Sequence, residues 1–313
     1  MMEEIDPTIF ADVADALGIE EPILVEKDYY AVQLLKSLHS INDSGYSIVF
    51  AGGTCLSKAH IDTFRMSEDV DIKLIPSLDV QNETRGQQRK LRGHYHQKIY
   101  SLLDAHSIFE LSEKSKRDEG KYLQCHIKYP RFHTTIDAIR PEILLEITES
   151  SLLDSTITAP IYSMYSKALK LPPEIPQCYC ATIEVTASEK LVALLRRTAA
   201  YERNPSSKDD KTLVRHIYDL HLINQSNADK DKISKLIKKV IEIDINEFGN
   251  QHPQFRDDPY KELLYGFEQI QNQEKFRVRY QKFIGPLVYN RNPASWEESM
   301  ASLNEIVTGL MKE

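Results

Sequence analysis

Two aspartates one residue apart carry the clearest chemistry in this sequence. Asp69 and Asp71 belong to the segment 69–75, D-V-D-I-K-L-I, in which polar and apolar residues alternate. A period of two predicts a β-strand with both aspartates on one face and Val70 and Ile72 on the other. Two neighbouring carboxylates repel each other, and a divalent cation that prefers oxygen ligands, such as Mg²⁺, relieves that repulsion. The pair therefore indicates a metal site.

A Gly-Gly-Thr turn lies upstream of the two aspartates. The apolar run 48–50 predicts a strand that ends at this turn. Gly52 and Gly53 allow the backbone to approach a ligand closely. Thr54 is expected to cap a following helix, whose first N–H groups can bind phosphate. Ser67 is expected to hydrogen-bond the same phosphates. A phosphate-binding turn beside two carboxylates is typical of nucleotidyl-transfer enzymes.

Each feature alone has a simpler explanation, and the combination favours the functional one. A Gly-Gly pair is usually only a turn, and an Asp-x-Asp on a strand is usually a solvated edge. Two other phosphate loops are excluded, because the turn matches neither G-x-x-x-x-G-K-[ST] nor G-x-G-x-x-G.

Three further residues are candidates with open alternatives. Glu146 lies within the apolar segment 143–148 and is the natural third carboxylate, unless it is a strand-end residue facing water. Lys58 follows Thr54 by one helical turn and either reaches a phosphate or forms a structural ion pair. Arg65 either binds nucleotide or anchors its loop to an acid.

The turn and the aspartates fit a known pattern. The segments G-G-T-x-L-x-K (52–58) and R-x-S-x-D-x-D (65–71) resemble the motifs of the DNA polymerase β-type nucleotidyltransferase superfamily. Within it, the chain resembles the AbiEii/AbiGii toxin family, the toxin half of bacterial abortive-infection toxin–antitoxin pairs. The segments that carry this further resemblance are VEKDYYAVQLL (25–35), ASEKLVALLRR (187–197) and VRHIYDLHLI (214–223).

The resemblance assigns further site residues. Lys190 resembles the lysine of the third motif, which contacts the triphosphate or helps to activate the acceptor. Asp219 resembles the aspartate of the fourth motif, and an acid set among apolar residues also needs a partner or a function. His216 stands where the family usually has another acid, although Asp219 itself is present. A carboxylate is also expected at Glu146.

The resemblance implies transfer of NMP from an NTP to an acceptor, with two Mg²⁺ ions about 3.5–4 Å apart at Asp69, Asp71 and Glu146. RNA, with tRNA 3′ ends in particular, and protein hydroxyls are the expected acceptors, and a cognate antitoxin is a possible partner. This would make the chain a toxin active in abortive infection and phage defence. The same loop and carboxylates would also serve a phosphotransferase that moves the γ-phosphate. A catalytically silent NTP-binding or partner-binding module is the third alternative, which three intact acids disfavour.

Bulk composition agrees with a soluble protein that acts in the cytoplasm. The hydrophobic fraction is 41%, the net charge is −8, and no apolar run reaches the ~18–20 residues of a membrane span. The acidic start of the sequence lacks the apolar core of a secretion signal. The four cysteines show no metal or disulfide spacing, and Cys178 and Cys180 are expected to be packed thiols.

The expected fold class is α+β. Residues 1–180 are predicted to form a polymerase β-type nucleotidyltransferase core, a small mixed sheet flanked by helices that includes two N-terminal helices within 7–40. Residues 181–313 are predicted to form a helical C-terminal domain. A long polar helix is expected at 82–106, with an apolar seam at Leu91, Tyr95, Ile99 and Leu102. The basic clusters 85–98 and 230–239 are either solvated helix faces or an RNA-docking surface.

Overall fold

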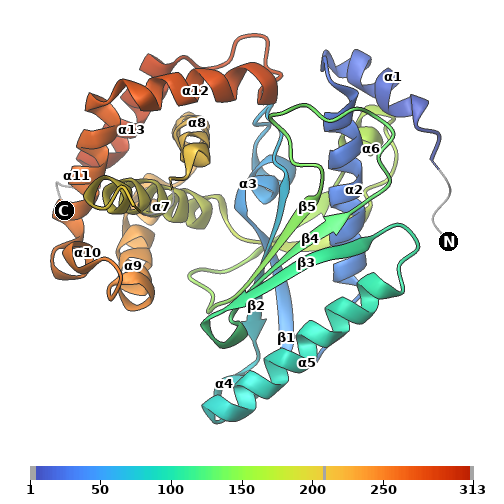
Figure 1. Cartoon of the computed structure of the whole chain (residues 1–313), viewed down its shortest axis with the longest axis horizontal. Coiled ribbons are helices and arrows are strands. Elements are labelled where there is room, and N and C mark those ends of the chain that lie inside the picture. The colour runs from blue at the N-terminus through green and yellow to red at the C-terminus, as the bar shows by residue number, and fades with distance from the viewer. Residues whose placement is uncertain (1–4, 207–208, 311–313) are drawn as a thin grey trace. The chain divides into compact units, whose positions relative to one another are not determined.

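The computed structural model describes residues 5–206 and 209–310. The chain divides into two compact units, Met1–Ala181 and Thr182–Glu313. The first unit contains all the described strands, and the second is helical (Figure 1). The expected α+β class is confirmed.

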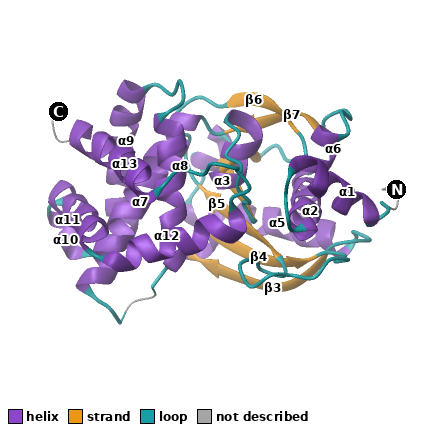
Figure 2. Ribbon diagram, turned by 90° about the horizontal axis from the view of Figure 1, so that it is seen from above, coloured by secondary structure: helices purple, strands orange, loops and turns teal. Residues whose placement is uncertain are grey.

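A seven-stranded mixed sheet organises the first unit, in the order β3-β4-β5-β2-β1-β7-β6. β2 pairs in parallel with β5 and antiparallel with β1, so it lies in the middle of the sheet. Figure 2 shows β6 and β7 at one end of the sheet and β3 at the other. The strands are β1 (Tyr46–Ala51), β2 (Asp69–Pro76), β3 (Glu110–Arg117), β4 (Tyr122–Lys128), β5 (Ile143–Glu149), β6 (Ile157–Ile161) and β7 (Ile175–Cys180).

Helices cover this sheet, and α2 and α5 pack against it. The helices of the first unit are α1 (Thr8–Leu17), α2 (Pro22–His39), α3 (Gly52–Cys55), α4 (Leu78–Gln81), α5 (Arg85–Asp104) and α6 (Met164–Ala168), with the π-turn η1 (Leu56–His60) and the 3₁₀-turn η2 (Asp118–Gly120). Both N-terminal helices expected within 7–40 are present. α2 is buried along most of its length, including three consecutive charged residues, Glu26, Lys27 and Asp28.

Several expectations about single elements were wrong. Thr54 does not cap α3, because the helix already begins at Gly52. The seam of α5 is shifted: Leu91 is exposed, whereas Leu103 is buried with Tyr95 and Ile99. The three prolines of the segment 171–177 predict a loop or linker, but β7 begins within it at Ile175.

The strand β3 was not expected either, because only one of its residues, Leu111, is a large apolar residue and most of the others are exposed. β3 is an edge strand, and charged side chains protect such an edge from pairing with another chain. The two buried thiols were expected correctly: Cys178 and Cys180 are buried on β7 and make no disulfide.

The second unit is built around the long helix α7, which contacts α8, α9 and α11. Its elements are α7 (Ile183–Arg203), η3 (Lys211–Leu213), α8 (Val214–Asn224), α9 (Lys230–Phe248), α10 (Pro253–Asp257), α11 (Pro259–Asn272), α12 (Glu274–Leu287) and α13 (Trp296–Leu310). Gly266 of α11 allows a close crossing with α7, since a Cβ there would lie 2.1 Å from the carbonyl oxygen of Leu195.

Candidate active site

The three candidate carboxylates share one face of the central strands. Asp71 of β2 lies directly opposite Glu146 of β5, and Asp69 lies opposite Leu144. Strict alternation along β2 buries Val70 and leaves both aspartates half-buried. In-register residues of adjacent strands point to the same face of a sheet. Asp71 and Glu146 are therefore neighbours, and Asp69 lies two residues further along the same face of β2.

The glycine turn lies directly against one of these carboxylates. Gly52 begins α3 with a φ of +72°, and a Cβ at this position would lie 1.9 Å from Oδ2 of Asp71. Two features therefore require a glycine at position 52: the positive φ and the close approach of Asp71. Gly53 follows as a buried residue of the same turn. The sequence placed the turn and the aspartates in one site, and the structure brings Gly52 and Asp71 into contact.

Thr54 and Ser67 border this turn in different ways. The Thr54 hydroxyl donates a hydrogen bond to the carbonyl oxygen of Asp69, so it joins α3 to the start of β2. Ser67 is half-buried, two residues before Asp69. The main observed role of Thr54 is thus to fix the strand that carries the aspartates.

Lys58 and Arg65 make structural contacts. The Lys58 ammonium lies 2.5 Å from Oδ1 of the buried Asp28 in α2. Of the two alternatives for Lys58, the structure shows the ion pair. Arg65 is buried, and its Nη1 donates to the carbonyl oxygen of Met66 at 2.8 Å. These contacts hold the helix and the loop that flank the aspartates.

Glu146 has partners that the sequence did not indicate. Gln124 of β4 donates from Nε2 to Oε1 of Glu146 at 3.1 Å, and the Tyr122 hydroxyl donates to the same oxygen. Burial raises the pKa of Tyr122, and its hydrogen bond to Glu146 raises it further, so the phenol keeps its proton. Glu146 is therefore an oriented side chain in the middle of a strand, not a strand-end residue facing water.

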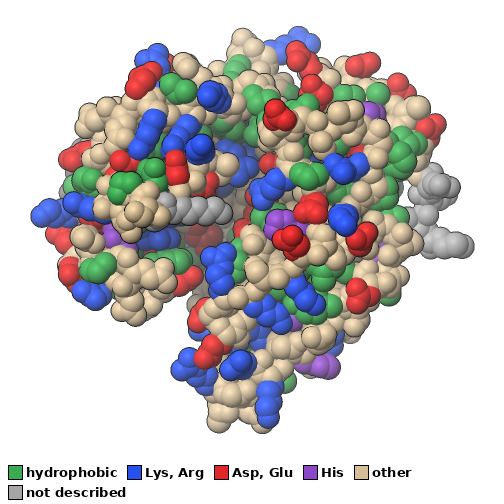
Figure 3. All heavy atoms as spheres, in the orientation of Figure 1, with side chains coloured by type: hydrophobic (Ala, Val, Ile, Leu, Met, Phe, Trp, Pro, Cys, Tyr) green, Lys and Arg blue, Asp and Glu red, His purple; other side chains and the backbone are tan. Residues whose placement is uncertain are grey.

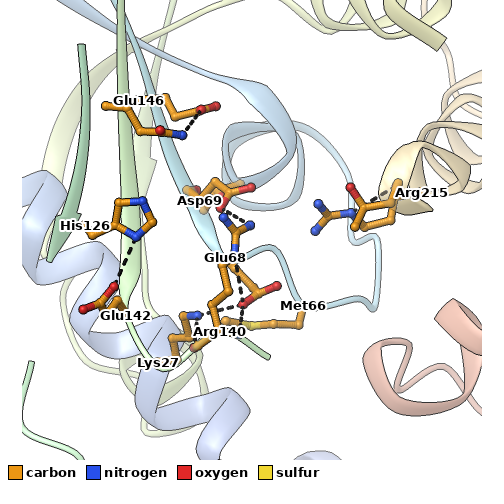
Figure 4. A network of polar contacts seen from close by, with 12 residues as sticks. Lys27, Met66, Glu68, Asp69, His126, Arg140, Glu142, Glu146 and Arg215 are labelled. Carbon is orange, nitrogen blue, oxygen red and sulfur yellow. Dashed lines mark hydrogen bonds and ion pairs between the residues drawn. The ribbon is translucent and has the colours of Figure 1, made fainter. Parts of the chain in front are cut away.

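A polar network that sequence reasoning missed lies at Asp69 (Figure 4). Nη2 of Arg140 donates to Oδ1 of Asp69 at 2.8 Å. The neighbouring Glu68 is buried and accepts from the Arg140 backbone N–H at 2.7 Å and from Nζ of Lys27 at 2.8 Å. Lys27 is fully buried; burial lowers its pKa, and the Glu68 charge opposes that shift. The only signal in the sequence was a run of three charges, Glu26 to Asp28, inside an otherwise apolar helix.

The third and fourth motifs meet within the second unit. Nζ of Lys190 in α7 lies 2.8 Å from Oδ2 of Asp219 in α8, and Asp219 is fully buried. Beside them, burial lowers the pKa of His216 well below its usual value, and the Lys190 charge lowers it further. His216 is thus a neutral imidazole next to a buried ion pair.

The predicted residues therefore form two groups. Asp69, Asp71, Glu146 and Gly52 gather in the first unit, and Lys190 and Asp219 pair in the second. Within the described residues, no three or more His, Cys, Asp or Glu side chains already converge on one metal position.

Comparison with known proteins decides the family. A family model described as "Nucleotidyl transferase AbiEii toxin, Type IV TA system" matches residues 33–302. The chain belongs to the AbiEii family. The family assignment made from the motifs is confirmed, and the chain is a nucleotidyltransferase of the type IV toxin–antitoxin class.

Among solved structures, this AbiEii chain is similar to MenT4, a nucleotidyltransferase toxin from Mycobacterium tuberculosis H37Rv. The TM-score is 0.59 at 17% sequence identity, over 99% of this chain and 91% of MenT4, which shows a shared fold. No curated protein matches the chain. Within the described residues, no helix is both long and apolar enough to cross a membrane.

Proposed function

We propose that this AbiEii chain transfers a nucleoside monophosphate from an NTP to an acceptor hydroxyl, with release of pyrophosphate. The observation that carries the proposal is the alignment of Asp69, Asp71 and Glu146 on one sheet face, with Gly52 against Asp71. Nucleotidyl transfer requires positioning of the phosphates and neutralisation of charge at the α-phosphate. Carboxylates beside a glycine turn meet that requirement.

The donor set fits the magnesium that such a reaction uses. Carboxylate oxygens are the ligands that Mg²⁺ prefers, and all three acids are half-buried on the same face. The Arg140 guanidinium and the Gln124 amide already hold oxygens of Asp69 and Glu146 by hydrogen bonds. Asp69, Asp71 and Glu146 would hold Mg²⁺, which would supply charge neutralisation at the reacting phosphate.

The remaining roles belong to the chain's own residues. Gly52 and Gly53 would offer backbone N–H groups to the β- and γ-phosphates, and Ser67 would add a hydroxyl donor. Lys190 would bind the triphosphate or assist the acceptor, as the family resemblance implies. Its ion pair with Asp219 restricts the lysine to one orientation.

RNA is the acceptor class that we propose first, with protein hydroxyls second. The basic cluster on α5 is smaller than the sequence suggested. Arg92 is buried against Glu149, and Arg85 and Lys98 are paired with Glu119 and Asp43. Figure 3 shows Lys and Arg side chains over the region of α4 and α5. Arg89 and Lys90 are exposed on α5 and are the better candidates for contact with a phosphate backbone.

We further propose that the chain acts in the cytoplasm as an abortive-infection toxin against phage, restrained by a cognate antitoxin. The type IV toxin–antitoxin family supports this partner.

Incubation with total RNA and each NTP, labelled in turn at the α- or γ-phosphate, tests the reaction type. Label from the α-position on RNA, with pyrophosphate released, supports the proposal. Label only from the γ-position would replace it with phosphotransfer. Label on the protein fraction alone would replace RNA as acceptor.

A further inference from the structure

We propose that Arg140 is a nucleotide-binding residue that stands in for a cation at Asp69 and moves to the triphosphate when metal and nucleotide bind. This inference rests on the proposed function, because it concerns the same site. It adds a residue, a ligand class and an order of events that the motifs do not contain.

A positively charged side chain already pairs with Asp69. Nη2 of Arg140 lies 2.8 Å from Oδ1 of Asp69, so one positive charge already occupies a carboxylate that the metal would need. The pair is not sealed inside the protein, because the side chains of Arg140 and Asp69 are 38% and 20% exposed. A partly exposed ion pair is weak, so a divalent cation can displace the guanidinium.

Buried partners hold the backbone of Arg140, whereas its side chain is partly exposed. The Arg140 N–H donates to Oε2 of Glu68 at 2.7 Å, and its carbonyl oxygen accepts from Nζ of Lys27 at 2.7 Å. Lys27 and Glu68 also pair with each other at 2.8 Å, and both are buried. These three contacts form a buried clamp on the loop between β4 and β5. The clamp leaves the guanidinium as the mobile part of the residue.

The Arg140 guanidinium can donate more hydrogen bonds than it makes in this structure. It has five N–H donors in a planar fork that matches phosphate oxygens. Within the described residues, only Nη2 of the Arg140 side chain makes a hydrogen bond, since Nε lies 3.9 Å from Oε2 of Glu68. The unused donors lie beside the carboxylates where the triphosphate is proposed to bind. Figure 4 shows Arg140 between Glu68 and Asp69.

The test uses the full chain with Arg140→Gln, which leaves the backbone clamp in place, and Arg131→Gln as the matched control. Arg131 is an exposed arginine in the same loop. Calorimetry measures two affinities, that for Mn²⁺ alone and that for each of the four α,β-non-hydrolysable NTP analogues with Mg²⁺. Thermal melting checks that each variant is folded, and Arg140→Lys is the second variant.

In Arg140→Gln, we expect Mn²⁺ to bind several-fold tighter without nucleotide, because its competitor is gone. We expect nucleotide affinity to fall at least about 10-fold, as for a lost charged hydrogen bond. Arg140→Lys should lose less nucleotide affinity, and Arg131→Gln should match the wild type.

The inference is wrong if the nucleotide affinity of Arg140→Gln stays within twofold of the wild type. It is also wrong if Arg131→Gln shows the same loss, or if Mn²⁺ and nucleotide affinities fall together. If Asp71→Asn is inactive while Arg140→Gln binds nucleotide normally, only this inference fails. If Asp71→Asn transfers nucleotide like the wild type, the proposed function itself fails.

Discussion

Gly52 links the fold to the proposed chemistry, because it shapes the turn and lies against Asp71. Its φ of +72° and the 1.9 Å that would separate a Cβ from Oδ2 of Asp71 leave no room for a side chain. We expect Gly52→Ala to displace Asp71, to reduce transfer by at least about 100-fold and to cost about 1–3 kcal/mol of unfolding free energy. Urea unfolding and the transfer assay measure the two effects.

Gly86→Ala is the matched control, because nothing lies within 4 Å of a Cβ at this exposed position of α5. It should retain activity and the unfolding free energy of the wild type, or gain up to about 1 kcal/mol. Equal behaviour of the two variants would contradict the close-approach argument.

The Lys190–Asp219 pair allows a prediction about stability in the second unit. Asp219→Ala leaves the buried Lys190 ammonium without the carboxylate at 2.8 Å, so we expect a loss of about 3–5 kcal/mol of unfolding free energy. Replacing both residues, as in Lys190→Met with Asp219→Leu, should recover much of that loss, because no uncompensated charge remains. Denaturant titration of both variants measures the loss and its recovery. A cost below about 1 kcal/mol for Asp219→Ala alone would show that the pair is not a buried one.

At the scale of the element, α5 contains a histidine that should make stability depend on pH. His96 is buried, and burial, assisted by the charges of Lys116 and Arg92, lowers its pKa to about 4. The unfolded chain, with a pKa near 6.5 at this residue, binds more protons between pH 4 and pH 6.5. The contribution of His96 is therefore complete above pH 6.5 and is lost as the pH falls toward 4, by about 3 kcal/mol at most.

Unfolding free energies measured from pH 4.5 to pH 7.5 test this dependence. His96→Gln should show a shallower decline toward acid than the wild type, whereas His94→Gln, at an exposed position of the same helix, should keep the wild-type slope. Parallel curves for His96→Gln and the wild type would contradict the argument.

The exposed side of α5 makes a separate prediction about the acceptor. An acidic protein must concentrate positive charge locally to hold RNA, and each neutralised phosphate steepens the salt dependence of binding. Reversal of Arg89 and Lys90 to Glu should weaken RNA binding, flatten the salt slope and leave NTP binding unchanged. Arg92 is unsuitable for reversal, because it is buried against Glu149. Unchanged RNA affinity and slope would mark this face as ordinary surface.

Elements with a clear period could be predicted from the sequence, whereas elements defined by their neighbours could not. Alternation in β2 correctly separated Asp69 and Asp71 from the buried Val70. β3 lacks such alternation. It is a strand because it pairs with β4, and its composition does not indicate one. The seam of α5 was misplaced because Arg92 and His96 occupy core positions that a hydrophobic pattern assigns to apolar residues.

At the scale of the whole molecule, the motifs identified the three candidate acids but did not identify the residues that orient them. Asp69, Asp71 and Glu146 could be proposed because residue type and strand position are local properties. Arg140 could not, because its contact with Asp69 joins residues 71 positions apart and depends on the clamp from α2. Nothing near Arg140 in the sequence marks it as a partner of the aspartates. The residues that position the candidate site can therefore be identified only from the three-dimensional structure.

One measurement tests most directly whether the carboxylates on β2 and β5 perform nucleotidyl transfer. The rate of α-label transfer from NTP to RNA is compared for the wild type, Asp71→Asn and the control Asp79→Asn, an exposed carboxylate in α4. Circular dichroism and thermal melting confirm that each variant is folded. We predict that Asp71→Asn loses at least about 1,000-fold in rate, since several kcal/mol of charge stabilisation are removed, while Asp79→Asn matches the wild type. Transfer by a folded Asp71→Asn variant at the wild-type rate would contradict the account.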